Sequence, residues 1–175
     1  TYELFRSYYA LPSIYAPDGT NVGAVRGLVQ SFLRLMREEN VTHIACAFDS
    51  VIESFRNEMF DGYKTGDDIP QDILDQFPIA ESIVANLGIT IWSMVDFEAD
   101  DAIASAVEYW SRSPDVDQII ICSPDKDLAQ MVEGDRVILF DRKGGKFLNE
   151  DAVVEKFGVH PLSIPDYLAL VGDAA

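Results

Sequence analysis

Apolar runs of strand length alternate along the chain with patterns of helical period. The run Asp117–Ser123 holds three consecutive isoleucines followed by a cysteine, and such a continuous apolar stretch is typical of a strand covered on both faces. A Gly-Gly turn over Lys143–Lys146 predicts that the last run folds back as a hairpin. The predicted strands are Thr42–Phe48, Ile89–Met94, Asp117–Ser123, Arg136–Phe140 and the short arm Lys146–Leu148.

Between these runs, apolar residues recur at the spacing of amphipathic helices. Strands separated by helices favour a parallel sheet with right-handed crossovers. We therefore expect the α/β class, as a three-layer α/β/α fold with a mainly parallel central sheet in one domain over 1–175. The predicted helices are Asn21–Glu39, Asp72–Leu87, Phe97–Arg112, Leu128–Val132, Glu150–Phe157 and Pro161–Val171.

One segment, Glu53–Asp72, has no clear period and collects polar residues, glycine and proline. A stretch of this length is too long for an ordinary connection between elements. Such loops are usually functional or disordered, so we expect this one, called the arch loop below, to matter for function.

The composition argues against a disordered chain and against a general polyanion-binding protein. With 13 basic and 30 acidic residues the formal charge is −17, yet 48% of the residues are hydrophobic, which is too many for a disordered chain. The charge argues against a general polyanion-binding surface. Cys46 and Cys122 lie in apolar runs outside any C-x-x-C pair, which indicates reduced thiols. Without a signal peptide or a membrane-length apolar stretch, the expected location is the cytoplasm.

Acidic residues follow the predicted strands. Open parallel sheets bind ligands beyond the carboxyl ends of their strands, so these acids are expected at one edge. A further acid ends the apolar C-terminal helix. The acids concerned are Asp49, then Glu98, Asp100 and Asp101, then Asp125 and Asp127, and finally Asp173.

Carboxylates gathered this closely repel one another unless a cation lies between them. Hard divalent cations take oxygen ligands and need neither Cys nor His. His43 and His160 lie outside the acidic group, so the pattern predicts Mg²⁺ or Mn²⁺ rather than zinc. Two such ions about 3.5–4 Å apart can activate water and stabilise the leaving oxygen in phosphodiester hydrolysis.

Each acid also has a structural interpretation. Asp49 is a common turn residue, and Asp125 and Asp127 can cap the short helix that follows them. The acids at 98–101 can complement a helix N-terminus. Glu98 and Asp101, three residues apart, share one helix face, whereas Asp100 points elsewhere unless it lies at the helix start. One of these three acids is therefore expected to be structural or to act from outside the ligand set.

Several segments, in order along nearly the whole chain, then make the sequence recognisable. They are Ala47-Phe48-Asp49, Phe55-Arg56-Asn57-Glu58, Tyr63-Lys64, Phe97-Glu98-Ala99-Asp100-Asp101, Ser123-Pro124-Asp125-Lys126-Asp127-Leu128, Phe157-Gly158-Val159 and Ile164-Pro165-Asp166-Tyr167-Leu168-Ala169-Leu170-Val171-Gly172-Asp173. The chain thereby resembles the 5′-3′ exonuclease domain of bacterial DNA polymerase I and the stand-alone bacterial 5′-3′ exonucleases, which are related to the flap endonucleases.

The resemblance implies a PIN-like fold and metal-dependent cleavage of DNA at 5′ ends, flaps and single-strand/duplex junctions, in replication and repair. It implies that Asp49, Glu98, Asp100, Asp101, Asp125, Asp127 and Asp173 are the metal-site acids, holding two Mg²⁺ or Mn²⁺ ions. It places the arch loop over the active site, where Arg56 and Lys64 contact phosphates and Tyr63 stacks on a base. Lys64 thereby joins the catalytic set. Arg6, in the first helix, and Lys126 complete the DNA-binding residues.

The sequence also departs from the family pattern. In the family a strand ending in Val-Asp-Gly precedes the segment matching Thr1–Arg6, and a helix-hairpin-helix follows the matching C-terminal segment. Neither lies within these 175 residues, so we expect a domain clipped at both ends. After Tyr63-Lys64 the usual basic residue is replaced by Thr65-Gly66-Asp67-Asp68, which weakens phosphate attraction.

These departures keep other functions open. A catalytically impaired DNA-binding module of the same fold, a PIN-type ribonuclease and, more remotely, a phosphatase using Asp125 and Asp127 are the alternatives. Bound metals would offset only a small part of the negative charge. We therefore expect weak non-specific DNA affinity with a strong salt dependence.

Overall fold

The strands pair in the parallel manner that the sequence predicts. The computed structural model describes residues 1–38, 40–142 and 144–172. The chain divides into two compact units, Thr1–Ala102 and Ile103–Ala175, and the boundary falls within helix α6 (Ala99–Trp110). A single domain over 1–175 and the three-layer order of helices and sheet therefore stay predictions.

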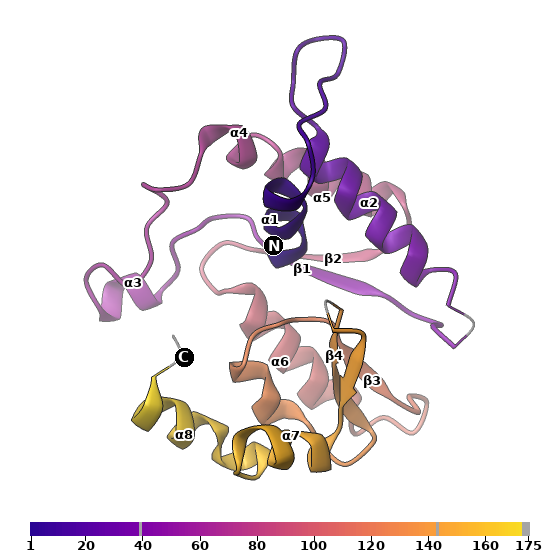
Figure 1. The fold of residues 1–175 in the computed structure, drawn as a ribbon, viewed down its shortest axis with the longest axis vertical. Coiled ribbons are helices and arrows are strands. Elements are labelled where there is room, and N and C mark those ends of the chain that lie inside the picture. The colour runs from indigo at the N-terminus through magenta and orange to yellow at the C-terminus, as the bar shows by residue number, and fades with distance from the viewer. Residues whose placement is uncertain (39, 143, 173–175) are drawn as a thin grey trace. The chain divides into compact units, whose positions relative to one another are not determined.

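The first unit holds a parallel pair of strands, β1 (Ala45–Asp49) and β2 (Thr90–Met94). Asp49 lies opposite Met94, so both strands end at the same edge. Helix α1 packs on α2, α2 on α5, and α5 on β2 (Figure 1). The helices of this unit are α1 (Tyr2–Ala10), α2 (Gly23–Leu35), α3 (Arg56–Met59), α4 (Gln71–Leu74) and α5 (Phe77–Asn86).

The second unit holds a three-stranded sheet in the order β3-β4-β5. The first pair is parallel and the second is the predicted antiparallel hairpin, although Lys143 of its turn lies outside the described residues. The strands are β3 (Ile119–Ile121), β4 (Val137–Asp141) and β5 (Lys146–Leu148), and the helices are the 3₁₀ turns η1 (Asp127–Met131) and η2 (Pro161–Ser163) with α7 (Glu150–Phe157) and α8 (Ile164–Val171).

Each unit has its own apolar core. In the first, Leu4 of α1, Leu28 of α2 and Phe48 of β1 are almost completely buried together. In the second, Val137 of β4 and Val153 of α7 are fully buried. In each unit, helices and strands together therefore supply the apolar core.

The crossing of α1 and α2 depends on Gly27. A Cβ at Gly27 would lie 2.5 Å from Leu11 Cδ1 and 2.7 Å from Ser7 Oγ. These distances are too short for any real side chain, so only glycine allows the two helices to approach this closely. The small residue is thus required by packing rather than by backbone conformation.

The prediction of one helix over Asp72–Leu87 is wrong. The structure has two helices there, α4 and α5, separated at Asp75 and Gln76. Pro78 lies in the first turn of α5, where proline starts a helix but lacks the N–H that a continuous helix would need. Gln76 is fully buried, and its Oε1 accepts from the N–H groups of Ala24 and Val25 at 3.1 and 3.3 Å. The break thus lets Gln76 cap the N-terminus of α2.

Smaller differences lie at element ends. The helix predicted to reach Glu39 ends at Leu35, and Glu39 itself lies outside the described residues. Burial raises the pKa of the Cys46 thiol to about 11, which keeps it protonated. In the part of the chain that the structure describes, no helix is long and apolar enough to span a membrane.

Candidate active site

Asp49 is the last residue of β1, and its carboxylate caps the N-terminus of α6. Its Oδ1 accepts a hydrogen bond from the Ala99 N–H, the first of α6, at 2.8 Å. The first N–H groups of a helix lack partners within the helix and carry partial positive charge, so a carboxylate is stabilised there. The contact joins the end of β1 to the segment that follows β2.

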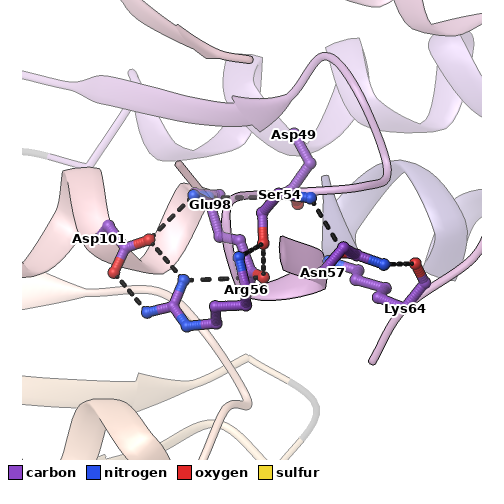
Figure 2. A network of polar contacts seen from close by, with 8 residues as sticks. Asp49, Ser54, Arg56, Asn57, Lys64, Glu98 and Asp101 are labelled. Atoms are coloured by element: carbon purple, nitrogen blue, oxygen red, sulfur yellow. Dashed lines mark hydrogen bonds and ion pairs between the residues drawn. The ribbon is translucent and has the colours of Figure 1, made fainter. Parts of the chain in front are cut away.

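Asp101 completes the same helix start. Its Oδ2 accepts from the Glu98 N–H at 2.9 Å, which is the reciprocal contact of a capping box. Both of its oxygens also accept from Arg56, at 2.8 Å from Nη1 and 2.7 Å from Nη2. Figure 2 shows this fork, with Glu98 on the other side of the guanidinium at 3.7 Å. Asp101 of α6 and Glu98, the residue just before this helix, therefore share one arginine from the arch loop.

These contacts set the charge states of the pair. The Arg56 guanidinium is the main cause that lowers the pKa of Asp101, and the Glu98 N–H lowers it further. The hydrogen bonds to Asp101 raise the pKa of Arg56 above its ordinary value. The pair is therefore ionised throughout the physiological range.

Aromatic contacts help to hold Arg56 in this place. Its Cζ lies 4.7 Å from the centroid of the Phe55 ring, within the range of cation–π attraction. Phe55 packs on Phe97 with centroids 5.2 Å apart, and its N–H donates to Asp96 O at 2.8 Å. The start of the arch loop is thereby fixed against the segment between β2 and α6.

Sequence reasoning assigned no role to Ser54 and Asn57, which extend the network. The Ser54 hydroxyl donates to Glu98 Oε1 at 2.7 Å. Asn57 Oδ1 accepts from the Ser54 N–H at 3.1 Å, and Asn57 Nδ2 donates to the Lys64 carbonyl at 2.6 Å (Figure 2). The only available signal was that both residues lie in or beside the Phe55–Glu58 motif.

Tyr63 and Arg6 are the other predicted DNA-binding residues of this unit. Tyr63 is 45% exposed on the arch loop, and its N–H donates to Phe60 O at 3.1 Å. Arg6 pairs with Glu3, one turn earlier in α1, at 2.6 Å. Tyr63 thus lies at an exposed position of the arch loop, whereas Arg6 is held along its own helix.

The acids of the second unit follow β3 as predicted. Asp125 Oδ1 accepts from the Asp127 N–H at 2.9 Å, and the Asp125 N–H donates to Ser123 Oγ at 3.2 Å. This turn leads into η1, with Lys126 at its N-cap position. Asp173 lies outside the described residues.

The donor chemistry suits a hard cation, with one exception. Asp49 and Glu98 each use only one carboxylate oxygen in the contacts above, and Asp100 lies in the first turn of α6. Asp101 uses both oxygens on Arg56, which favours it as the acid of the three that the sequence expects to be structural. Over residues 1–38, 40–142 and 144–172, no three Asp, Glu, His or Cys side chains gather closely enough to hold an ion. The shared metal site across both units therefore stays a prediction.

Comparison with protein families gives a match over most of the chain. The model of the family described as "5′-3′ exonuclease, N-terminal resolvase-like domain" matches residues 1–158. A DNA polymerase I from Mycobacterium leprae is 37% identical over 97% of this chain and 19% of its own length. A 5′-3′ exonuclease from Aquifex aeolicus is 32% identical over 97% of this chain and 58% of its own length. These matches confirm the resemblance found in the sequence motifs.

Solved structures give the same fold. A T5 protein co-crystallised with metal ions has a TM-score of 0.69 and 15% identity, covering 85% of this chain and 58% of that one. T5 5′-exonuclease with bound divalent metal ions (zinc) has a TM-score of 0.57 and 14% identity, covering 86% of this chain and 60% of that one. At this identity the likeness confirms the α/β fold. The chain spans about a fifth of its polymerase relatives and somewhat over half of the exonuclease relative.

Proposed function

Because the chain belongs to the family of 5′-3′ exonuclease N-terminal resolvase-like domains, we propose that it is the catalytic part of a metal-dependent 5′-3′ nuclease. Its substrate is DNA with 5′ ends or flaps, and its reaction is phosphodiester hydrolysis in replication and repair. The observation that carries the proposal is the hydrogen bond from the Ala99 N–H to Asp49, which joins the end of β1 to the start of α6, directly after Glu98.

Divalent ions such as Mg²⁺ or Mn²⁺, when bound, polarise the scissile phosphate and lower the pKa of the attacking water. In this chain Asp49, Glu98 and Asp100 would hold them from the first unit. The family resemblance assigns the same role to Asp125, Asp127 and Asp173. The all-oxygen donor set and the relatives described with metal ions support this assignment.

The basic residues of the arch loop take different roles. Both terminal nitrogens of Arg56 bind Asp101, so we assign Arg56 to holding the acidic segment in place. Lys64 is half-buried, and its carbonyl accepts a hydrogen bond from Asn57. We assign its ammonium to steering the scissile phosphate. Neutralising charge that develops on that phosphate is the usual contribution of such a group.

The test is cleavage of a 5′-flap DNA in Mg²⁺ by the unaltered chain and by Asp125→Asn and Asp127→Asn. We expect each substitution to reduce the rate by roughly 100-fold or more, because even partners of metal ligands cost 10–100-fold. Asp117→Asn is the matched control, since this exposed acid precedes β3 at the end opposite Asp125. Activity that survives both site substitutions would overturn the metal assignment.

A second candidate, a DNA-binding module of impaired catalysis, is favoured by two observations. Arg56 binds the carboxylate of Asp101. The exposed residues after Lys64 include Asp67 and Asp68 rather than a basic residue. Calorimetric titration with Mn²⁺ separates the two functions. The nuclease binds the ion and loses that binding on Asp125→Asn, whereas the impaired module binds no ion tightly in either form. Faster cleavage of RNA than of flap DNA would instead indicate a ribonuclease.

A further inference from the structure

Asn57 closes the arch loop on itself. Its side-chain amide uses both of its ends, accepting at Oδ1 from the Ser54 N–H at 3.1 Å and donating from Nδ2 to the Lys64 carbonyl at 2.6 Å. The second bond joins Asn57 to Lys64, the two ends of a segment that includes the exposed residues Phe60 and Tyr63. One side chain therefore fixes where the main chain of Lys64 lies relative to α3.

Ser54 joins this closure to an acid of the candidate site. Ser54 is 8% exposed, and its hydroxyl donates to Glu98 Oε1 at 2.7 Å while accepting from the Arg56 N–H at 3.3 Å. Glu98, with a side chain 13% exposed, is thus held by a buried group of the arch loop. A continuous chain of hydrogen bonds runs from the Glu98 carboxylate through Ser54 and Asn57 to the Lys64 main chain (Figure 2).

We propose that Asn57 is a positioning residue that sets the place of Lys64 relative to the Glu98 carboxylate. This role rests on the proposed nuclease function, in which Lys64 meets the scissile phosphate. Misplacing a reacting group by about 1 Å can cost roughly 100-fold in rate, and a lysine stem on a loose loop samples many positions. The Asn57 tie removes that freedom before the substrate binds.

Only an amide satisfies both contacts of Asn57. An aspartate keeps the acceptor for the Ser54 N–H but places a carboxylate oxygen against the Lys64 carbonyl, so two acceptors face each other. A leucine satisfies neither group. Asn57→Asp is therefore a change of a single donor, with the size of the side chain preserved.

The first test compares cleavage of a 5′-flap DNA by the unaltered chain and by Asn57→Asp. We expect kcat to fall about 10-fold while KM stays within about twofold, because the tie acts on Lys64 and not on the grip of the duplex. The matched control is Asn86→Asp, since exposed Asn86 also donates from Nδ2 to a main-chain carbonyl, that of Ser82, at 2.8 Å. Equal kcat values for the two variants would overturn the proposal.

The second test is a double-substitution cycle with Lys64→Ala. If Asn57 acts through Lys64, Asn57→Asp has no further effect on kcat once the lysine side chain is gone. Independent, multiplying effects would show a general structural role and contradict the positioning role. Ser54→Thr, which keeps the hydroxyl, is expected to retain most activity that Ser54→Ala loses.

Amide hydrogen exchange of residues 58–66 gives a readout that needs neither metal nor DNA. Asn57→Asp is expected to speed exchange there at least fivefold and to leave α2 unchanged, with an unaltered circular dichroism spectrum. Unchanged exchange in this segment would refute the tie itself. If the unaltered chain cleaves no flap DNA, the proposed function and the catalytic part of this role both fail, whereas the exchange result still judges the tie.

Discussion

The guanidinium of Arg56 binds both carboxylate oxygens of Asp101, 45 residues later in the chain, at 2.7 and 2.8 Å. Bidentate contacts of this kind fix orientation as well as distance. Since Asp101 also caps α6, the pair links the arch loop to the helix that carries Asp100 and begins directly after Glu98.

Removing this arginine should weaken the fold in a pH-dependent way. Arg56→Gln is expected to lower the free energy of unfolding at pH 7 by about 1–2 kcal/mol, since the pair is partly buried. The pKa of Asp101 is lower in the folded than in the unfolded chain. Its stabilisation is therefore complete above the unfolded value of about 3.9 and is lost as the pH falls through the folded value.

Urea unfolding in a chelator between pH 7 and pH 3 measures this effect. The difference between the unaltered chain and Arg56→Gln should be constant down to about pH 5 and shrink below about pH 4. Arg112→Gln is the control, because its partner Glu108 lies one turn away on an exposed surface, where such pairs contribute about 0.3–0.5 kcal/mol. A difference that grows on acidification would have the wrong sign for this pair.

The Asp49 cap can be separated from a metal role by choosing the substitution. Asp49→Asn keeps an oxygen for the Ala99 N–H, so stability should change by less than about 0.5 kcal/mol. Flap cleavage should nevertheless fall roughly 100-fold, because the charge for the cation is lost. Asp49→Ala should lose both properties. A fully active Asp49→Asn chain would leave this residue as a cap alone.

Gly27→Ala tests the crossing of α1 and α2. The new methyl group would overlap Leu11 and Ser7, and such overpacking typically costs about 1–3 kcal/mol. Gly66→Ala is the matched control, since its Cβ would meet nothing nearer than Ile52 at 3.8 Å. Thermal unfolding of the two variants compares them directly, and equal midpoints would show that α1 and α2 can separate without cost.

Gln76→Leu tests the buried cap of α2. Two N–H groups, those of Ala24 and Val25, lose their acceptor in a site where water cannot replace it, which should cost about 2–4 kcal/mol. Gln71→Leu, at an exposed position of α4, should cost less than about 0.5 kcal/mol. Similar denaturation midpoints for the two variants would contradict the capping role.

The sequence predicted best those elements that carry local signals. The helix Glu150–Phe157 has the predicted bounds, because Gly158 takes the left-handed conformation that ends a helix, with φ of 76°. The helix predicted over Asp72–Leu87 failed at Gln76, whose side chain belongs to the N-terminus of a helix some 50 residues earlier. The hydrophobic periodicity of a segment cannot reveal a hydrogen-bond partner this far away in the sequence.

In the candidate site, too, the sequence indicated the features with local signals and missed those that depend on distant partners. Residues at the ends of strands were found because the carboxyl ends of parallel strands share one edge, as Asp49 and the start of α6 now do. The roles of Asp101 and Arg56 could not be separated from those of their neighbours, since charge alone does not show which acid an arginine will bind. Ser54 and Asn57 were missed because common polar residues in a loop acquire meaning only from their partners.

The central claim is that this chain hydrolyses DNA from its 5′ end with the help of a divalent metal ion. The most direct measurement follows a 5′-flap duplex, labelled separately at each end of the flap strand, in EDTA and then with excess Mg²⁺ or Mn²⁺. We expect no cleavage in EDTA, and release of short products that carry the 5′ label once the metal ion is added. Cleavage that continues in EDTA, or shortening from the 3′ end, would contradict it.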